Sequence, residues 1–192
     1  NQPVGCTATI VYQMYHENNV EIDKATAGML CSAIISDTLL FRSPTCTPID
    51  KMAATELAKI AEIDMDRYAA DMFSAGSNLG SRTAEEIFYQ DFKRFDVGNV
   101  EFGVGQINSM NAVELEEIRE KLIPYLPVAH RESGLNMIFF MLTNILEEST
   151  ELIYCGKNAK QLVADGFYTK AGENATVLPG VVSRKKQLIP AF

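Results

Sequence analysis

The chain has 192 residues, of which 47% are hydrophobic and 22% are charged, and 17 basic against 25 acidic residues give a net charge of −8. This composition is typical of a folded globular protein and argues against a disordered chain. No apolar run is long enough for a membrane-spanning helix, no secretory leader is recognisable, and the acidic balance disfavours nucleic acid as a partner.

The first part of the chain predicts helices. Small and apolar residues dominate 4–18, and 24–36 is apolar or small on most sides, which is typical of a buried helix. Residues 5–7, Gly-Cys-Thr, either pack closely or offer free N–H groups to a phosphate. At 47–50, Thr-Pro-Ile-Asp predicts a helix start with a capping box. A further helix is expected over 65–73.

A small, polar, glycine-rich stretch follows at 74–81, with the sequence Ser-Ala-Gly-Ser-Asn-Leu-Gly-Ser. Such a composition is typical of a linker. We therefore expect two domains, over 1–75 and 83–192, joined by residues 76–82.

After this linker the pattern is that of an α/β domain. Residues 100–104 alternate as a half-buried strand does, and 135–142 is a continuous apolar run typical of a central strand. The other expected strands are 91–96, 151–154, 176–178 and 181–189, and the expected helices are 83–89, 112–122 and 158–163. The first domain is expected to supply helices to a sheet that is mostly absent from this chain.

Four cysteines and two histidines form no recognisable metal or redox motif. The cysteines are Cys6, Cys31, Cys46 and Cys155. They contain no C-x-x-C pair, and a chain of this length needs no disulfides, so we expect reduced thiols and a cytoplasmic protein. His16 and His130 lie far apart, which disfavours a histidine-rich metal site and a histidine-based triad.

Asp37 is the acidic residue whose position most needs an explanation. It follows Ala-Ile-Ile-Ser at the expected C-terminal end of a buried helix. Loss of hydration and the negative end of the helix dipole both disfavour a carboxylate there. A metal ion would offset this cost, and so would hydrogen bonds to the irregular stretch 38–46 that follows. Both interpretations stay open from the residues alone.

Basic residues at two places could bind an anion. Arg184, Lys185 and Lys186 form the one run of three basic residues in the sequence, within Ser-Arg-Lys-Lys-Gln. Arginine can bind two phosphate oxygens at once and lysine adds positive charge, although a solvated edge strand protected by lysines is the alternative. Lys93 lies between aromatic residues in Asp-Phe-Lys-Arg-Phe, where a surface strand and an anion site both stay open.

Taken in this order, the segments resemble the C-terminal portion of a family II (manganese-dependent) inorganic pyrophosphatase of the DHH phosphoesterase superfamily. The similar motifs are Pro-Val-Gly-Cys-Thr-Ala-Thr at 3–9, Ser-Ala-Ile-Ile-Ser-Asp-Thr-Leu-Leu-Phe at 32–41, Ser-Pro-Thr-Cys-Thr at 43–47 and Gly-Val-Val-Ser-Arg-Lys-Lys-Gln at 180–187. The resemblance implies the helical C-terminal part of a metal-binding DHH domain over 1–75. The α/β, DHH-associated substrate-binding domain, with a mixed sheet, would follow over 83–192.

The resemblance implies roles for four residues. Asp37 matches an aspartate that binds the catalytic metal pair. Arg184 and Lys185 match an arginine–lysine pair that binds the phosphates of pyrophosphate, and Lys93 matches a further substrate-binding lysine. In such enzymes two metals about 3.5–4 Å apart can activate a water for in-line attack. The implied cofactor is Mn²⁺, with Mg²⁺ or Co²⁺ as alternatives.

The sequence also departs from the family. The motifs His-x-Asn-Pro-Asp-x-Asp and Asp-His-His are absent, and one carboxylate cannot hold a metal pair. We therefore expect this chain to be an inactive part of a longer enzyme, with or without a CBS insertion, that hydrolyses pyrophosphate as a homodimer away from nucleic acid and membranes. The alternatives are a related DHH phosphoesterase acting on polyphosphate or oligonucleotides, and a non-catalytic anion-binding or interaction module.

Overall fold

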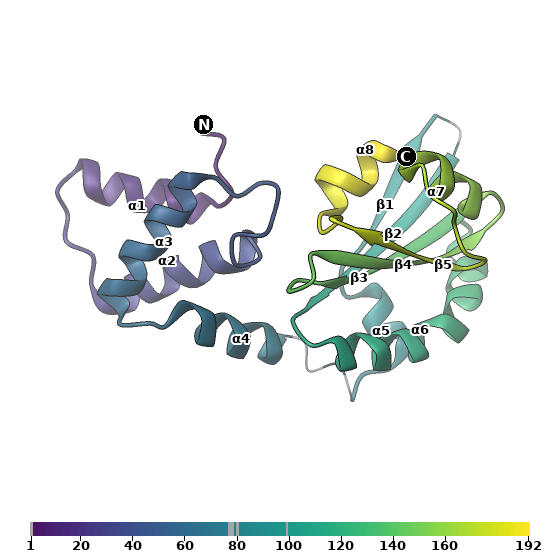
Figure 1. Ribbon diagram of the computed structural model, residues 1–192, viewed down its shortest axis with the longest axis horizontal. Helices are drawn as coiled ribbons and strands as arrows, with labels where there is room; N and C mark the ends of the chain where they lie inside the picture. The colour runs from purple at the N-terminus through teal and green to yellow at the C-terminus, as the bar shows by residue number, and fades with distance from the viewer. Residues whose placement is uncertain (1, 77–78, 80, 99) are drawn as a thin grey trace. The chain divides into compact units, whose positions relative to one another are not determined.

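The computed structural model describes residues 2–76, 79, 81–98 and 100–192. The chain falls into two compact units, Asn1–Ala75 and Gly76–Phe192 (Figure 1). Three residues of the expected linker, 77, 78 and 80, lie outside the described residues. The assignment of the first unit to part of a DHH domain stays a prediction.

The described part of the first unit is helical, as predicted. Its helices are α1 (Thr7–Glu17), α2 (Lys24–Asp37), α3 (Pro48–Ala61) and α4 (Met65–Gly76). Helices α1, α2 and α3 pack against one another, and Ala27, Ile34 and Leu57 are fully buried. The expectation that α2 is buried on most sides is wrong for this unit, since Met29 in its middle is 67% exposed.

Asp50 is a fully buried carboxylate that joins the start of α1 to the start of α3. It completes the predicted capping box with Thr47, whose N–H and hydroxyl each donate to it at 2.7 Å. The hydroxyl of Thr9 donates to the same carboxylate at 2.6 Å, and the N–H of Gly5 at 2.9 Å. A buried charge of this kind is tolerated because donors surround it.

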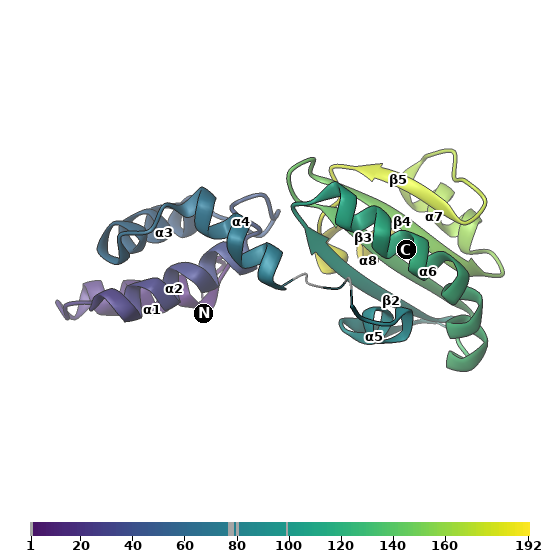
Figure 2. The ribbon, with the colours of Figure 1, turned by 90° about the horizontal axis from the view of Figure 1, so that it is seen from below.

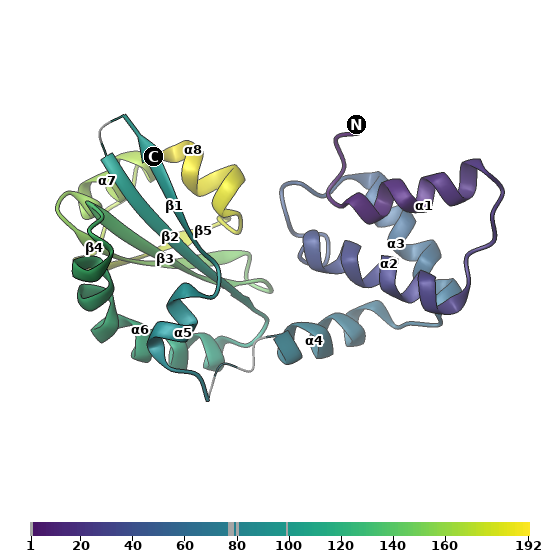
Figure 3. The same ribbon diagram turned by 180° about the vertical axis from the view of Figure 1, so that it is seen from behind.

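The second unit contains a five-stranded mixed sheet in the order β1-β2-β3-β4-β5 (Figures 1 and 3). The strands are β1 (Phe92–Val97), β2 (Val100–Ser109), β3 (Met137–Asn144), β4 (Ser149–Gly156) and β5 (Ala175–Pro179). The β2 and β3 strands are parallel, joined through α6 (Ala112–Ser133), and the other neighbours are antiparallel. β3 is buried along its whole length, which confirms the predicted central strand and the mixed α/β fold.

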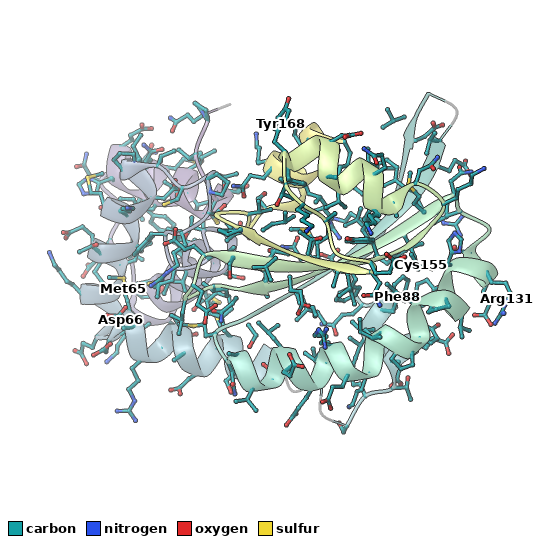
Figure 4. The ribbon with its side chains drawn as sticks, turned by 45° about the vertical axis from the view of Figure 1, so that its right-hand side comes forward. Met65, Asp66, Phe88, Arg131, Cys155 and Tyr168 are labelled. Carbon is teal, nitrogen blue, oxygen red and sulfur yellow. The ribbon has the colours of Figure 1, made fainter. Side chains whose placement is uncertain are left out.

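Helices cover both faces of this sheet (Figure 2). On one face, α5 (Ala84–Tyr89) and α6 pack around Phe88 and Phe140, and Cys155 lies against the same core (Figure 4). On the other face are α7 (Ala159–Phe167), a π-helical turn η1 (Arg184–Leu188) and α8 (Ile189–Ala191). Phe139 and Leu188 are buried in that second core.

Helix α6 extends eleven residues beyond the predicted end at 122, to Ser133, even though it contains Pro124 and Pro127. Both prolines are exposed, while Leu122, Leu126 and Ala129 continue the buried side. Carbonyl groups freed by the prolines can therefore bind water, and packing keeps the helix intact. Within the described residues, no helix is both long enough and apolar enough to cross a bilayer.

We predict that Asp50→Asn destabilises the first unit by about 3 kcal/mol, because an amide cannot accept from all these donors. Burial alone would raise the pKa of Asp50, but the hydrogen bonds from Thr9, Thr47 and Gly5 outweigh it and lower that pKa. The stabilisation is therefore present above the pKa of the unfolded carboxyl and is lost as the pH falls through the folded pKa.

Urea unfolding followed by NMR signals of α1, at pH values from neutral to strongly acidic, measures both effects. The exposed Asp71→Asn in α4 is the matched control and should change the unfolding free energy by less than about 0.5 kcal/mol. Equal stability of Asp50→Asn and wild type at neutral pH would contradict the role given to Asp50.

Candidate functional site

The motif Ser-Arg-Lys-Lys-Gln forms the π-helical turn η1, so the strand expected over 181–189 is wrong. The side chain of Gln187 explains the turn, since its oxygen accepts from the N–H groups of Val182 (2.9 Å) and Ser183 (3.0 Å). Its amide group donates to the carbonyl of Gly180 at 2.6 Å. These bonds curl the chain where a strand would need to stay extended. Turns of this type are rare in proteins, and those that occur often lie at functional sites.

Arg184 is buried beneath this turn, with 8% of its side chain exposed. Its Nη2 lies 2.9 Å from each carboxylate oxygen of Asp91. Its Nη1 donates to the backbone carbonyls of Asp91 (2.6 Å) and Val104 (3.0 Å). Because Asp91 directly precedes β1 and Val104 lies in β2, Arg184 holds η1 against the first two strands.

Lys93 meets Arg184 at the same carboxylate. Its Nζ lies 3.8 Å from Oδ1 of Asp91, and 62% of its side chain is exposed. Lys93 on β1 is also the register partner of Val104 on β2. The carbonyl of Val104 accepts a hydrogen bond from Arg184. Two of the predicted substrate-binding residues, far apart in the sequence, are therefore neighbours in the second unit.

Lys185 and Lys186 are exposed on η1, directly after Arg184. We call Lys93, Arg184, Lys185 and Lys186, together with the carboxylate of Asp91 that contacts Lys93 and Arg184, the cation cluster. Its net charge is positive although the chain is acidic. Guanidinium and ammonium groups in such a cluster can bind the oxygens of a phosphate.

Two residues beside the cluster were not singled out from the sequence. Asp91 stands in the motif around Lys93, but the sequence gives no sign of its contact with Arg184, because the two residues are far apart along the chain. Gln106 on β2 donates through Nε2 to the carbonyl of Val182 (3.2 Å) and to the hydroxyl of Thr143 (3.2 Å). It supports the segment that leads into η1. The sequence signal that could have pointed to Gln106 is the alternation along β2, which places Gln106 on the same face of the sheet as Val104.

Asp37 is the last residue of α2 and is exposed, so the expected burial of its carboxylate is wrong. The next residue, Thr38, takes the buried position. Its hydroxyl donates to the carbonyl of Ile34 at 2.6 Å and accepts from the N–H of Phe41 at 3.2 Å. A hydrated carboxylate needs no metal to offset burial, and the support for a ligand role of Asp37 is the resemblance.

The chain directly after Thr38 is left-handed. Leu39, Leu40 and Phe41 have φ values of 50°, 48° and 67°, a region that residues other than glycine rarely occupy. The irregular stretch expected over 38–46 is present, and its conformation is more strained than a simple loop. Three such residues in a row persist where surrounding contacts enforce them, which is common at functional sites.

Two N–H groups that precede α1 already have an acceptor within the protein. Those of Gly5 and Cys6 donate to Asp50, at 2.9 Å and 3.4 Å. A Cβ on Gly5 would lie 2.9 Å from Cγ2 of Thr38, so close packing requires the glycine. These contacts favour the close-packing interpretation of residues 5–7 over the phosphate interpretation.

Cys6 lies beside Asp37. Burial and a hydrogen bond to that carboxylate raise the pKa of Cys6 to about 12, so the thiol stays protonated at neutral pH. A protonated thiol is a poor metal ligand, which leaves the oxygens of Asp37 as the donors there. In the described part of the chain, no three His, Cys, Asp or Glu side chains gather as a metal site. These residues alone do not fit a two-metal centre.

Comparisons with known proteins confirm the family that the sequence motifs resemble. The family model of the DHHA2 domain matches residues 70–192. The chain is 44% identical, over 99% of its length, to a Clostridium acetobutylicum protein named as a manganese-dependent inorganic pyrophosphatase, and it covers 61% of that protein. It is 40% identical, again over 99% of its length, to a cobalt-dependent inorganic pyrophosphatase of Clostridium perfringens, of which it covers 34%.

A solved structure is also similar. A Methanococcus jannaschii protein assigned to the family II inorganic pyrophosphatases matches 99% of this chain and 64% of its own, with a TM-score of 0.84 and 36% identity. The chain thus spans about three fifths of the length of several relatives that it matches, such as the Clostridium acetobutylicum protein.

We predict that Arg184→Ala lowers the free energy of unfolding of the second unit by about 2–3 kcal/mol, because it removes the hydrogen bonds to the carboxylate of Asp91 and to the carbonyls of Asp91 and Val104. Urea unfolding followed by NMR signals of β2 measures this. Lys186→Ala on the exposed side of η1 is the control and should change the value by less than about 0.5 kcal/mol. Equal effects of the two variants would contradict the anchoring role of Arg184.

Proposed function

Because the chain belongs to the DHHA2 domain family, we propose that it forms part of a metal-dependent inorganic pyrophosphatase, which hydrolyses pyrophosphate to two phosphates. The observation that carries this proposal is the cation cluster, in which Lys93 and Arg184 meet at Asp91. The named activities of relatives similar over nearly the whole chain favour pyrophosphate over polyphosphate, oligonucleotides or a non-catalytic role.

Within this proposal the cation cluster binds the substrate. Pyrophosphate is a compact polyanion, and the exposed ammonium groups of Lys93 and Lys185 can approach its oxygens without further opening of the fold. Positive charge held in place before the reaction stabilises the charge that develops on the leaving phosphate. Arg184 contributes its charge from a buried position and fixes the turn that carries Lys185.

The metal part of the site is incomplete in this chain. We propose Asp37 as one ligand of a metal pair, with Mn²⁺ as the metal and Mg²⁺ or Co²⁺ as alternatives, since relatives are named for manganese and cobalt. When bound, such a pair supplies the activated water that attacks phosphorus. The remaining ligands would come from a part of the whole enzyme outside these 192 residues. We expect that enzyme to be a cytoplasmic homodimer.

In the whole enzyme, Lys93→Ala and Lys185→Ala should each raise the KM for pyrophosphate roughly ten- to hundredfold, since each removes a charged hydrogen bond to the substrate. Phosphate release with Mn²⁺ present measures this. Lys170→Ala, an exposed lysine in the same unit, is the control and should leave KM unchanged. Equal KM values for all three variants would contradict the substrate-binding role of the cluster.

The 192-residue chain alone should bind pyrophosphate but release no phosphate from it, with Mn²⁺ or Co²⁺ present. The reason is that Asp37 by itself cannot hold two metals. Calorimetry measures the binding, and a colorimetric phosphate assay measures turnover. Turnover that a chelator abolishes would show that the chain holds a complete metal centre and would overturn this part of the proposal.

A further inference from the structure

The two terminal nitrogens of Arg184 have acceptors of different kinds. Nη1 is held by the backbone carbonyls of Asp91 and Val104, which belong to the chain entering β1 and to β2. Nη2 is held by the side-chain carboxylate of Asp91, which is 48% exposed. The carbonyls cannot leave without disturbing the sheet, whereas an exposed carboxylate can rotate into water.

The carboxylate of Asp91 also lies close to two cations of a kind that bind phosphate oxygens. It is 2.9 Å from Nη2 of Arg184 and 3.8 Å from Nζ of Lys93. An anionic oxygen between a guanidinium and an ammonium is the arrangement that these cations make with a phosphate. The protein thus places its own anion among the groups that would recognise a substrate anion.

We propose that Asp91 is an internal competitor for phosphate: its carboxylate occupies Nη2 of Arg184 and the vicinity of Lys93, and pyrophosphate or phosphate binds by displacing it. This inference rests on the proposed function and adds an affinity-setting residue to that site. Displacement leaves Nη1 of Arg184 on its carbonyl acceptors, so η1 stays in place while Nη2 changes partner. The affinity of the cluster for phosphate groups is kept low by the same competition.

Removal of the Asp91 carboxylate should change the affinity for the anion in opposite directions, depending on whether Asp91 competes with the anion or positions Arg184. If Asp91 competes, Asp91→Asn lowers the thermal stability of the chain, because it weakens the bond to Arg184, and at the same time tightens anion binding. If Asp91 positions Arg184 for substrate, the same variant weakens binding. If its role is structural only, stability falls and binding per folded molecule does not change.

The experiment is calorimetric titration of the 192-residue chain with inorganic pyrophosphate and, separately, with inorganic phosphate. We expect Asp91→Asn and Asp91→Ala to lower both dissociation constants roughly tenfold, because binding of the anion no longer has to break the charged hydrogen bond between Asp91 and Arg184. Asp96→Asn is the matched control. Asp96 is an exposed acid on β1 that, among the described residues, forms no hydrogen bond to Lys93 or Arg184, and its variant should stay within about twofold of wild type.

Weaker or unchanged binding in both Asp91 variants would overturn the inference while leaving the proposed function intact, provided that wild type binds pyrophosphate. Absence of binding in wild type and in both variants would contradict the proposed site and the inference together. Should the variants fail to fold, the wild type still decides: saturation with pyrophosphate should shift the side-chain carboxyl ¹³C signal of Asp91 far more than that of Asp96. Equal shifts of the two signals would overturn the inference.

Discussion

The hydrogen bonds between the guanidinium of Arg184 and the Asp91–Val104 region are the interaction on which the second unit's candidate site depends. A buried arginine must find acceptors, because an unpaired charge away from water is strongly destabilising. These acceptors lie at the start of the sheet, while the arginine comes from the end of the chain. Satisfying one buried charge therefore places η1 and Lys93 side by side.

The first unit follows the same physical logic with the opposite charge. Asp50 is buried, and donors from the start of α1 and from Thr47 satisfy it. This network also holds the N–H of Cys6, and burial together with the carboxylate of Asp37 raises the pKa of the Cys6 thiol. In each unit a buried charged group with distant partners joins separate segments of the chain, and exposed candidate residues lie nearby: Asp37 in the first unit, and Lys93 and Lys185 in the second.

Local patterns predicted the elements well where a local cause dominates. The capping box at Thr47 set the start of α3, and the apolar run at 135–142 predicted the central strand β3. The errors arose where distant partners decide. The segment 181–189 has the composition of a strand, but Gln187 and Arg184 bind groups that force a π-helical turn. The burial of Asp37 was wrong because Thr38, one residue further, takes the buried position. The link between Lys93 and Arg184 through Asp91 has no local signal at all.

Residues at the start of β1 and residues of η1 are proposed to form one phosphate-binding site. The most direct measurement is an NMR titration of the backbone amides of the 192-residue chain with pyrophosphate. We expect amide signals near Lys93 and near Lys185 to shift together and to fit a single dissociation constant. Shifts confined to one of these segments, or two segments with different dissociation constants, would contradict it.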